Sequence, residues 1–183
     1  MREHTEALSA LGVRVQSVRT PAELEGVEAL VLPGGESTTL GMLLRSSGLD
    51  GPLRERLAGG MPAFGTCAGM ILLATTVLDG RADQVPLAAI DIVVRRNAFG
   101  RQLESFESDL SITGLDSPMH AVFIRAPIVE RYGEGVRVLA AVEYREELRP
   151  VVCQEGRVLI ASFHPELTSD RRLHELFLTH IGI

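Results

Sequence analysis

The sequence predicts a layered α/β fold built around a mostly parallel sheet. Short apolar runs alternate with helical stretches, and several of those runs stop at turn residues, as buried parallel strands do. The chain has 183 residues, of which 45% are hydrophobic and 23% charged, which is typical of one globular domain. We find no repeat, low-complexity tract or linker that would divide it. We therefore expect a single domain over residues 1–183.

The first half of the chain carries the clearest helix and strand alternation. The run ALVLP (29–33) is continuously apolar and ends at PGGES, which favours a buried parallel strand. The other elements that we expect here are a helix over 3–12, a strand over 13–18 (VRVQSV), a short helix from TPAEL, helices over 38–46 and 52–58, a strand over 61–64 (MPAF) and an apolar helix over 68–78 (AGMILLATTVL). On these patterns we place Met42, Met61 and Met70 in the core.

The second half is richer in β-branched runs bounded by turn residues. We expect strands at AIDIVVRR, AVFIRAP, RVLAAVEY, PVVCQEG and RVLIASF. Residues 170–181 have a helical pattern opened by Asp170.

The charge of the chain argues against two classes of partner. A net charge of −6 and a pI near 5.4 do not suit nucleic acid or an anionic membrane as the main partner. No apolar run approaches the roughly 20 residues that span a bilayer, and the charged start lacks a signal core, so we expect a cytoplasmic protein.

The segment from Gly65 to Gly69 (GTCAG) has the form of a nucleophile elbow. It lies between a predicted strand and an apolar helix, where a tight turn would project the Cys67 side chain. A cysteine at a helix N-terminus is favoured as thiolate, and the N–H of Ala68 would face a developing oxyanion. The alternative interpretation is a buried core cysteine in a turn bounded by glycines.

The segment Phe163-His164-Pro165-Glu166 follows the apolar strand RVLIASF and supplies a candidate base. Residues i and i+2 of an extended chain face one side, so Glu166 can bond one ring nitrogen of His164 while the other takes the Cys67 proton. The alternative is a surface histidine beside a salt-bridging glutamate. The order Cys, His, acid differs from the nucleophile, acid, His order of α/β-hydrolases, which argues against that fold.

The segment PGGESTT (33–39) also follows a buried strand and opens a helix. Adjacent glycines let backbone N–H groups point into a cleft, which suits an anion or oxyanion. The alternative is a simple turn with Ser37 or Thr38 as the helix N-cap. The G-K-[ST] ending of a phosphate loop is missing.

The other cysteine and histidines have no spacing that indicates chemistry. We expect Cys153 to be a small core residue, and no Cys or His spacing indicates a metal site. We expect surface or helix-end positions for His4, His120, His174 and His180.

PGGEST, GTCAG, RNAFGRQ, FIRAP and SFHPEL occur in that order. Together they closely resemble the glutaminase subunits of pyridoxal 5′-phosphate synthase, within the class I (triad) glutamine amidotransferases, and the resemblance covers nearly the whole chain. It implies a flavodoxin-like three-layer sandwich that needs no cofactor or metal. It also implies a Cys67, His164 and Glu166 triad that hydrolyses glutamine through a glutamyl thioester.

The resemblance further implies which residues hold the substrate. The N–H groups of Gly35 and Ala68 would form the oxyanion hole. The substrate-binding set would be Gly35, Glu36, Ser37, Arg96, Ile124 and Arg125. Cationic Arg96 and Arg125 suit the α-carboxylate of glutamine.

Members of this family pass ammonia to a separate (β/α)₈-barrel synthase subunit in a large hetero-oligomer, and we expect the same partner here. They also begin with a short apolar strand and a Leu-Gln-Gly loop before the segment that matches Met1-Arg2-Glu3-His4, and we expect that strand to be missing. Our hypothesis is that Met1 is a misassigned start, which the upstream reading frame would test. Three alternatives stay open: a catalytically impaired docking subunit, an amidotransferase domain of another pathway, and a cysteine hydrolase of unrelated substrate.

Overall fold

The structure, a computed structural model, describes residues 1–81, 86–96 and 105–183. A five-stranded sheet lies at its centre, in the order β1-β2-β10-β9-β8. These strands are β1 (Leu30–Leu32), β2 (Ala63–Thr66), β10 (Val158–Ala161), β9 (Glu147–Glu155) and β8 (Arg137–Tyr144). The pairs β1–β2 and β2–β10 are parallel, and β9 joins β10 and β8 in antiparallel pairs. The predicted α/β class is confirmed.

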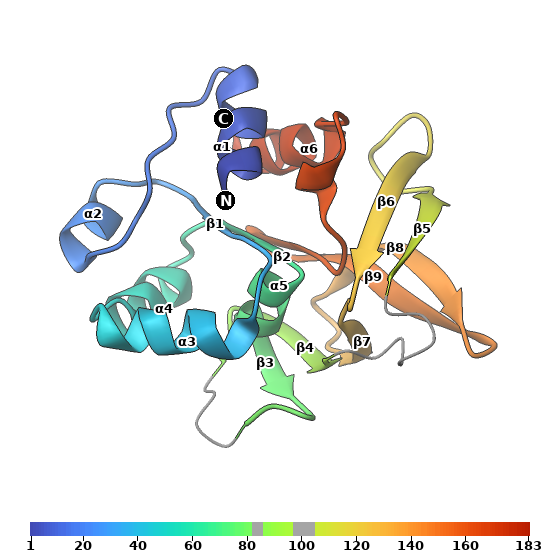
Figure 1. Ribbon diagram of the computed structural model, residues 1–183, viewed down its shortest axis with the longest axis horizontal. Coiled ribbons are helices and arrows are strands. Elements are labelled where there is room, and N and C mark those ends of the chain that lie inside the picture. Colours follow the sequence, from blue (N-terminus) through green and yellow to red (C-terminus); the bar gives the residue numbers. More distant parts are fainter. Residues whose placement is uncertain (82–85, 97–104) are drawn as a thin grey trace.

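Helices cover both faces of this sheet, which makes three layers (Figure 1). On one face lie α1 (Arg2–Ala10) and α6 (Arg172–Ile181), and on the other α2 (Pro21–Glu25), α3 (Ser37–Ser46), α4 (Asp50–Ala58) and α5 (Ala68–Leu73). Successive residues of β2 point to opposite layers: Phe64 packs with the α1 and α6 side chains, and Ala63 with the α2, α4 and α5 side chains. Burial on both faces explains why β2 has no polar alternation.

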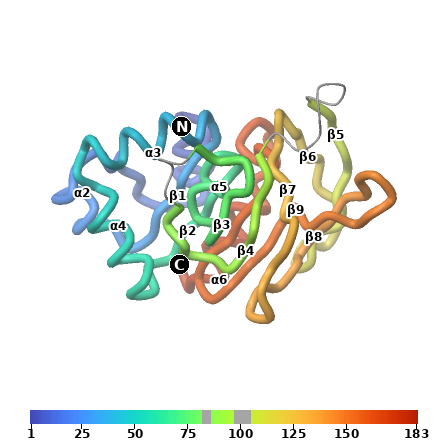
Figure 2. Tube along the Cα trace, turned by 90° about the horizontal axis from the view of Figure 1, so that it is seen from below, coloured from blue at the N-terminus to red at the C-terminus, as the bar shows by residue number. Residues whose placement is uncertain are grey.

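The remaining strands form two smaller sheets. β4 (Ile90–Arg95) lies between β3 (Ala74–Val77) and β7 (Ile128–Tyr132). β5 (Ser105–Leu110) and β6 (Met119–Ile124) form an antiparallel pair. Figure 2 shows β5, β6, β8 and β9 at the opposite end of the molecule from α2 and α4. The strands β5 and β7 were not predicted.

Local signals explain where the helices begin and end. Thr20 and Glu23 form a capping box at the start of α2, with Pro21 at its first position. At the start of α3 the Glu36 carboxylate accepts from the backbone N–H groups of Thr38 and Thr39, so Glu36 is the N-cap. The alternative assignment of the cap to Ser37 or Thr38 was therefore wrong.

Two predicted elements differ in the structure. The segment 13–18 forms no strand, although VRVQSV has the residue types of one, because a strand requires a pairing partner and no backbone pairing is described for it. The helix predicted over 68–78 ends at Leu73, and β3 follows at once. In β3 the hydroxyl group of the β-branched Thr75 donates to the carbonyl oxygens of Ile90 and Ile92 in β4. Pairing with β4 therefore replaces the continued helix at this position.

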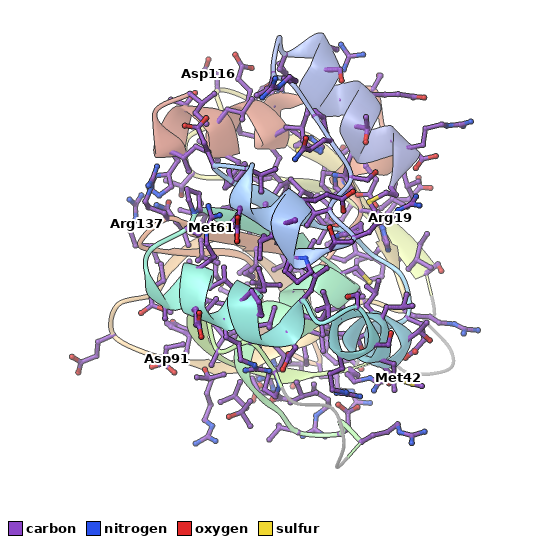
Figure 3. All side chains as sticks on the ribbon, turned by 90° about the vertical axis from the view of Figure 1, so that its left-hand side faces the viewer. Arg19, Met42, Met61, Asp91, Asp116 and Arg137 are labelled. Atoms are coloured by element: carbon purple, nitrogen blue, oxygen red, sulfur yellow. The ribbon has the colours of Figure 1, made fainter. Side chains whose placement is uncertain are left out.

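The core assignments were correct with one exception. Met61, Met70 and Cys153 are buried as expected. Met42 is 53% exposed and lies on the outer side of α3 (Figure 3). Burial raises the pKa of the Cys153 thiol to about 12, which fits a core residue without chemistry.

Candidate active site

Cys67 lies at the sharp turn between β2 and α5, as the elbow motif predicts. Its backbone has φ 47° and ψ −103°, a conformation that residues other than glycine rarely adopt. The Cys67 N–H donates to the Ala161 carbonyl at 2.9 Å, which holds the turn against β10. The strained backbone therefore coincides with the candidate nucleophile.

The glycines of the elbow allow close backbone packing. A Cβ at Gly69 would overlap the carbonyl oxygen of Leu32 in β1. A Cβ at Gly65 would lie 2.8 Å from the Gly69 carbonyl oxygen. The start of α5 can thus press against the sheet only if neither position carries a side chain.

His164 follows β10 at the same sheet edge as Cys67, because β2 and β10 are parallel neighbours. Its backbone N–H donates to the Val122 carbonyl of β6 at 3.0 Å, so a second sheet also holds it. The ring Nδ1 lies 2.8 Å from Glu166 Oε1, and the side chains are 14% and 7% exposed. Cys67 lies close enough to the His164 ring to act on it electrostatically. The three residues are therefore contiguous, although Cys67 and His164 are 97 positions apart in sequence.

The electrostatics of this group favour a charged imidazole. Burial alone would lower the pKa of His164, but hydrogen bonds and charge attraction from Cys67 and Glu166 outweigh it and raise that pKa to about 10. Burial likewise opposes ionisation of Glu166, yet the hydrogen bond with His164 and the nearby His4 hold its pKa below the ordinary value. An imidazole held charged between a cysteine and a carboxylate is the arrangement expected of an activated thiol.

Glu166 reaches His164 by a different backbone path from the one expected. It lies in a 3₁₀ turn, Pro165–Leu167, and not on an extended chain. The i, i+2 argument from an extended strand was therefore wrong in its geometry, although the predicted hydrogen bond forms. Proline at the first position of the turn explains the change, because its fixed φ suits a helical start.

The segment after β1 lies directly over this group. A Cβ at Gly34 would overlap His164 Cε1 and lie 3.4 Å from Cys67 Cβ. Gly35 has φ 139°, a conformation open to glycine. The Gly34-Gly35 segment therefore faces the thiol and the imidazole with backbone atoms and no side chain.

Arg96 joins the same loop. Its guanidinium donates to Thr38 Oγ1 at 3.1 Å and lies 3.4 Å from Glu36 Oε1. Burial opposes ionisation of Glu36, but hydrogen bonds from Thr39 and Thr38 prevail and lower its pKa to about 2. Ser37 is buried at the first position of α3. The rest of RNAFGRQ, residues 97–102, lies outside the described residues.

Ile124 and Arg125 lie where β6 ends. Ile124 is partly exposed, and Arg125 has φ 45°. The Val122 carbonyl that accepts from His164 belongs to the same strand, so β6 leads from the triad to this pair.

Two histidines near the triad were missed. His4 and His174 are buried, at 3% and 0% exposure, so a surface position is wrong for both, although each lies in the first turn of its helix as a helix-end residue would. Helical spacing could have indicated this, since buried Ala7 and Leu8 follow His4 at i+3 and i+4, and Phe177 and Leu178 follow His174 likewise. His120 is about half exposed, as expected, and His180 lies in the last turn of α6.

The structure also contains an apolar cavity of about 870 Å³ beside β1. His4, Leu8, Leu30 and Phe177 line it, together with the segment 13–19, but none of the triad residues does.

Among the described residues, no helix has the length and apolar character to cross a bilayer. Within the same ranges, no group of three or more His, Cys, Asp or Glu side chains could hold a metal ion.

Comparison with known proteins identifies relatives over the whole chain. The profile of the SNO glutamine amidotransferase family matches residues 1–182. Pyridoxal 5′-phosphate synthase subunit PdxT of Mycobacterium sp. strain KMS is 57% identical over 99% of this chain and 87% of its own length. The same subunit of Nocardioides sp. strain JS614 is 54% identical over 97% of this chain and 89% of its own length.

Solved structures agree. A crystal structure described as a glutamine amidotransferase covers 100% of this chain and 94% of its own chain, with a TM-score of 0.90 at 50% identity. A chain in the structure of PurLQS from Thermotoga maritima covers 98% of this chain and 92% of its own length, with a TM-score of 0.66 at 15% identity, and so shares the fold.

Proposed function

The chain belongs to the SNO glutamine amidotransferase family, and from that premise we propose that it hydrolyses L-glutamine to L-glutamate and ammonia with Cys67, His164 and Glu166. Its ammonia would supply pyridoxal 5′-phosphate synthesis, the activity in the name of its relatives. The observation that carries the catalytic assignment is the buried His164 imidazole, held 2.8 Å from Glu166 and close enough to Cys67 to interact with it electrostatically. No other nucleophile is needed.

The first half-reaction forms a thioester. The Cys67 sulfur attacks the side-chain amide carbon of glutamine, and the carbonyl oxygen becomes an oxyanion. The N–H groups of Gly35 and Ala68 would stabilise this charge. The His164 imidazolium then gives its proton to the amide nitrogen, the C–N bond breaks, and ammonia leaves.

The second half-reaction uses the same imidazole as a base. Once the sulfur is acylated it carries no negative charge, so the part of the raised His164 pKa that comes from Cys67 disappears. Neutral His164 takes a proton from water, which attacks the thioester carbon. Collapse of that intermediate releases glutamate and returns the sulfur as thiolate beside imidazolium. Glu166 holds the ring in one orientation through both steps.

Substrate binding follows from the groups around the thiol. Gly35, Glu36 and Ser37 would bind glutamine with the backbone and carboxylate of the loop. Arg96, 3.4 Å from Glu36, would pair with the substrate α-carboxylate, with Ile124 and Arg125 on the β6 side. Glu36 is held ionised and could bind the α-ammonium group.

The partner and setting are part of the same proposal. We infer that residues 1–183 act as one glutaminase domain in the cytoplasm. It would dock on a (β/α)₈-barrel synthase subunit within a large hetero-oligomer and deliver ammonia there.

Glutamate formation in the presence of the synthase subunit tests the proposal. We expect Cys67→Ala to abolish it and Cys153→Ala, a change at the other buried cysteine, to retain it. A glutamine analogue that traps the thioester should add mass at Cys67 in the wild type and not in Cys67→Ala. Full activity in Cys67→Ala, or no glutamate from the wild-type complex, would refute the assignment.

A further inference from the structure

The contacts of the triad do not end at Glu166. His4 in α1 places Nε2 at 3.3 Å from Glu166 Oε2 and at 3.1 Å from Thr66 Oγ1, the residue before the nucleophile. His4 Nδ1 lies 2.9 Å from His174 Nε2 in α6, the helix beside α1 (Figure 1). A continuous polar chain therefore runs from Cys67 through His164 and Glu166 to His4 and His174.

The second oxygen of Glu166 needs a donor. Its Oε1 is bonded to His164, whereas Oε2 is buried and, by strict hydrogen-bond geometry, has no partner among the described residues. A buried carboxylate oxygen without a donor is costly, since charged groups lose strong hydration on burial. His4 Nε2 lies within ion-pair distance of that oxygen, at 3.3 Å, while its hydrogen bond in this arrangement is with Thr66 Oγ1 at 3.1 Å.

One set of tautomers satisfies the whole chain. If His4 carries its hydrogen on Nε2, its Nδ1 is a lone pair that accepts from His174 Nε2–H. His174 Nδ1 is then a bare lone pair, which fits its lack of a partner among the described residues. The opposite tautomer of His4 would turn a lone pair toward the Glu166 carboxylate.

Burial keeps both rings neutral. It lowers the pKa of His4 and lowers that of His174 to about 4. Phe64 of β2 packs edge-on against both rings, at centroid distances of 6.3 and 5.6 Å. The groups that act electrostatically on the two rings are Glu166, His164, Glu3, Arg171 and the Met1 amino group.

We propose that His4 is a positioning residue for glutamine hydrolysis, which orients Glu166 through its Nε2–H and is itself held in that tautomer by His174. The proposal rests on the proposed function, because the reaction that it serves is the one assigned to Cys67. His4 acts through Glu166 and need not touch substrate. It also joins the acid to Thr66, so α1 holds both sides of the triad together.

Kinetics of three variants test the role, with rates expressed per site trapped by the glutamine analogue so that unfolded protein is not counted. His4→Leu removes the donor, and we expect kcat with the synthase to fall about 10- to 100-fold while KM changes less than about twofold. His4→Gln returns an N–H near the Nε2 position and should recover most of kcat. Leu8→Ala, a buried change on the same helix, should lower stability and leave kcat per site unchanged.

The pH profile separates positioning from a structural role. Loss of the donor disfavours the Glu166 carboxylate, so the acid limb of kcat should move to higher pH in His4→Leu and stay in place in Leu8→Ala. An unchanged kcat and profile in His4→Leu, or an equal loss in His4→Gln, would overturn the proposal.

A measurement without glutamine keeps this result distinct from the proposed function. The chain has five histidines, so ¹⁵N-histidine NMR can resolve each ring. We expect His4 and His174 as neutral Nε2–H tautomers at pH 7. A protonated His4, or an Nδ1–H tautomer, would refute the positioning role even in an active enzyme. An inactive wild type with these tautomers would refute only the glutaminase assignment.

Discussion

Gly34→Ala is the sharpest test of how the triad is held, because it adds one methyl group directly above it. That carbon would overlap His164 Cε1 and lie 2.8 Å from Nδ1. To reach the 3.4 Å of ordinary contact the ring must move by at least 0.6 Å, and by more at Cε1, which is closer still. Such a shift lengthens the 2.8 Å bond to Glu166. A displacement near 1 Å typically costs about 100-fold in rate.

The assay is glutamate formation with the synthase subunit, beside Gly41→Ala as the matched control. Gly41 is a buried glycine of α3, and a Cβ there would make an ordinary contact with Leu72 Cδ2 at 3.8 Å. Gly41→Ala should keep kcat and add up to about 1 kcal/mol of stability from helix propensity. Gly34→Ala should lose about 100-fold in kcat with an almost unchanged denaturation midpoint, since a movable side chain relieves the clash. If Gly34→Ala kept kcat within twofold of wild type, the argument from packing would fail.

Three further changes test the charge and strain of the site. Arg96→Gln should raise KM for glutamine about 10-fold or more, whereas Arg95→Gln, a change at its neighbour that pairs with Glu130, should not. Equal KM values in the two variants would count against Arg96. The folded-state pKa of His174 is about 4, below the 6.5 of an ordinary histidine, so the unfolded state binds more protons and stability falls by up to about 3 kcal/mol from pH 6.5 to 4. Denaturation of His174→Leu across that range should show a shallower slope, and an equal slope would be contrary evidence. The free energy of unfolding of Cys67→Gly should exceed that of Cys67→Ala by about 1 kcal/mol, because glycine adopts φ 47° without strain and alanine does not. If Cys67→Ala were the more stable variant, the argument from backbone strain would be contradicted.

Local chemistry made the nucleophile and its base predictable from sequence. GTCAG carries glycines at both positions where the turn packs closely, Gly65 and Gly69, and the apolar strand before His164 ends at the same sheet edge. Parallel strands order these edges, so two motifs distant in sequence could be expected to meet. The fold class was predictable for the same reason.

The errors arose where pairing or burial by distant segments decides the outcome. Residues 13–18 have strand-forming side chains, but no strand that pairs with them is described. Thr75 lies in a strand and not in the predicted helix, because β4 provides a strand with which β3 pairs. The sequence around His4 or His174 alone indicates no role, because the two rings meet through the packing of α1 beside α6. Sequence spacing could have placed each on an apolar helix face but could not show that the two faces meet.

The arrangement also explains how a strained and charged site can persist in a domain of marginal stability. The backbone of Cys67 is fixed by Gly69 against Leu32 and by its own N–H on Ala161, so the sheet supports the strain. The charges are supported separately, because His164 and Glu166 compensate each other and the His4 ring stays neutral behind them. Since Gly69 and the Ala161 carbonyl lie outside α1, a change at His4 removes its contacts with Glu166 and Thr66 but leaves these two supports of the Cys67 backbone in place. That separation is why His4→Leu is expected to lower kcat while Cys67 remains open to the trapping analogue.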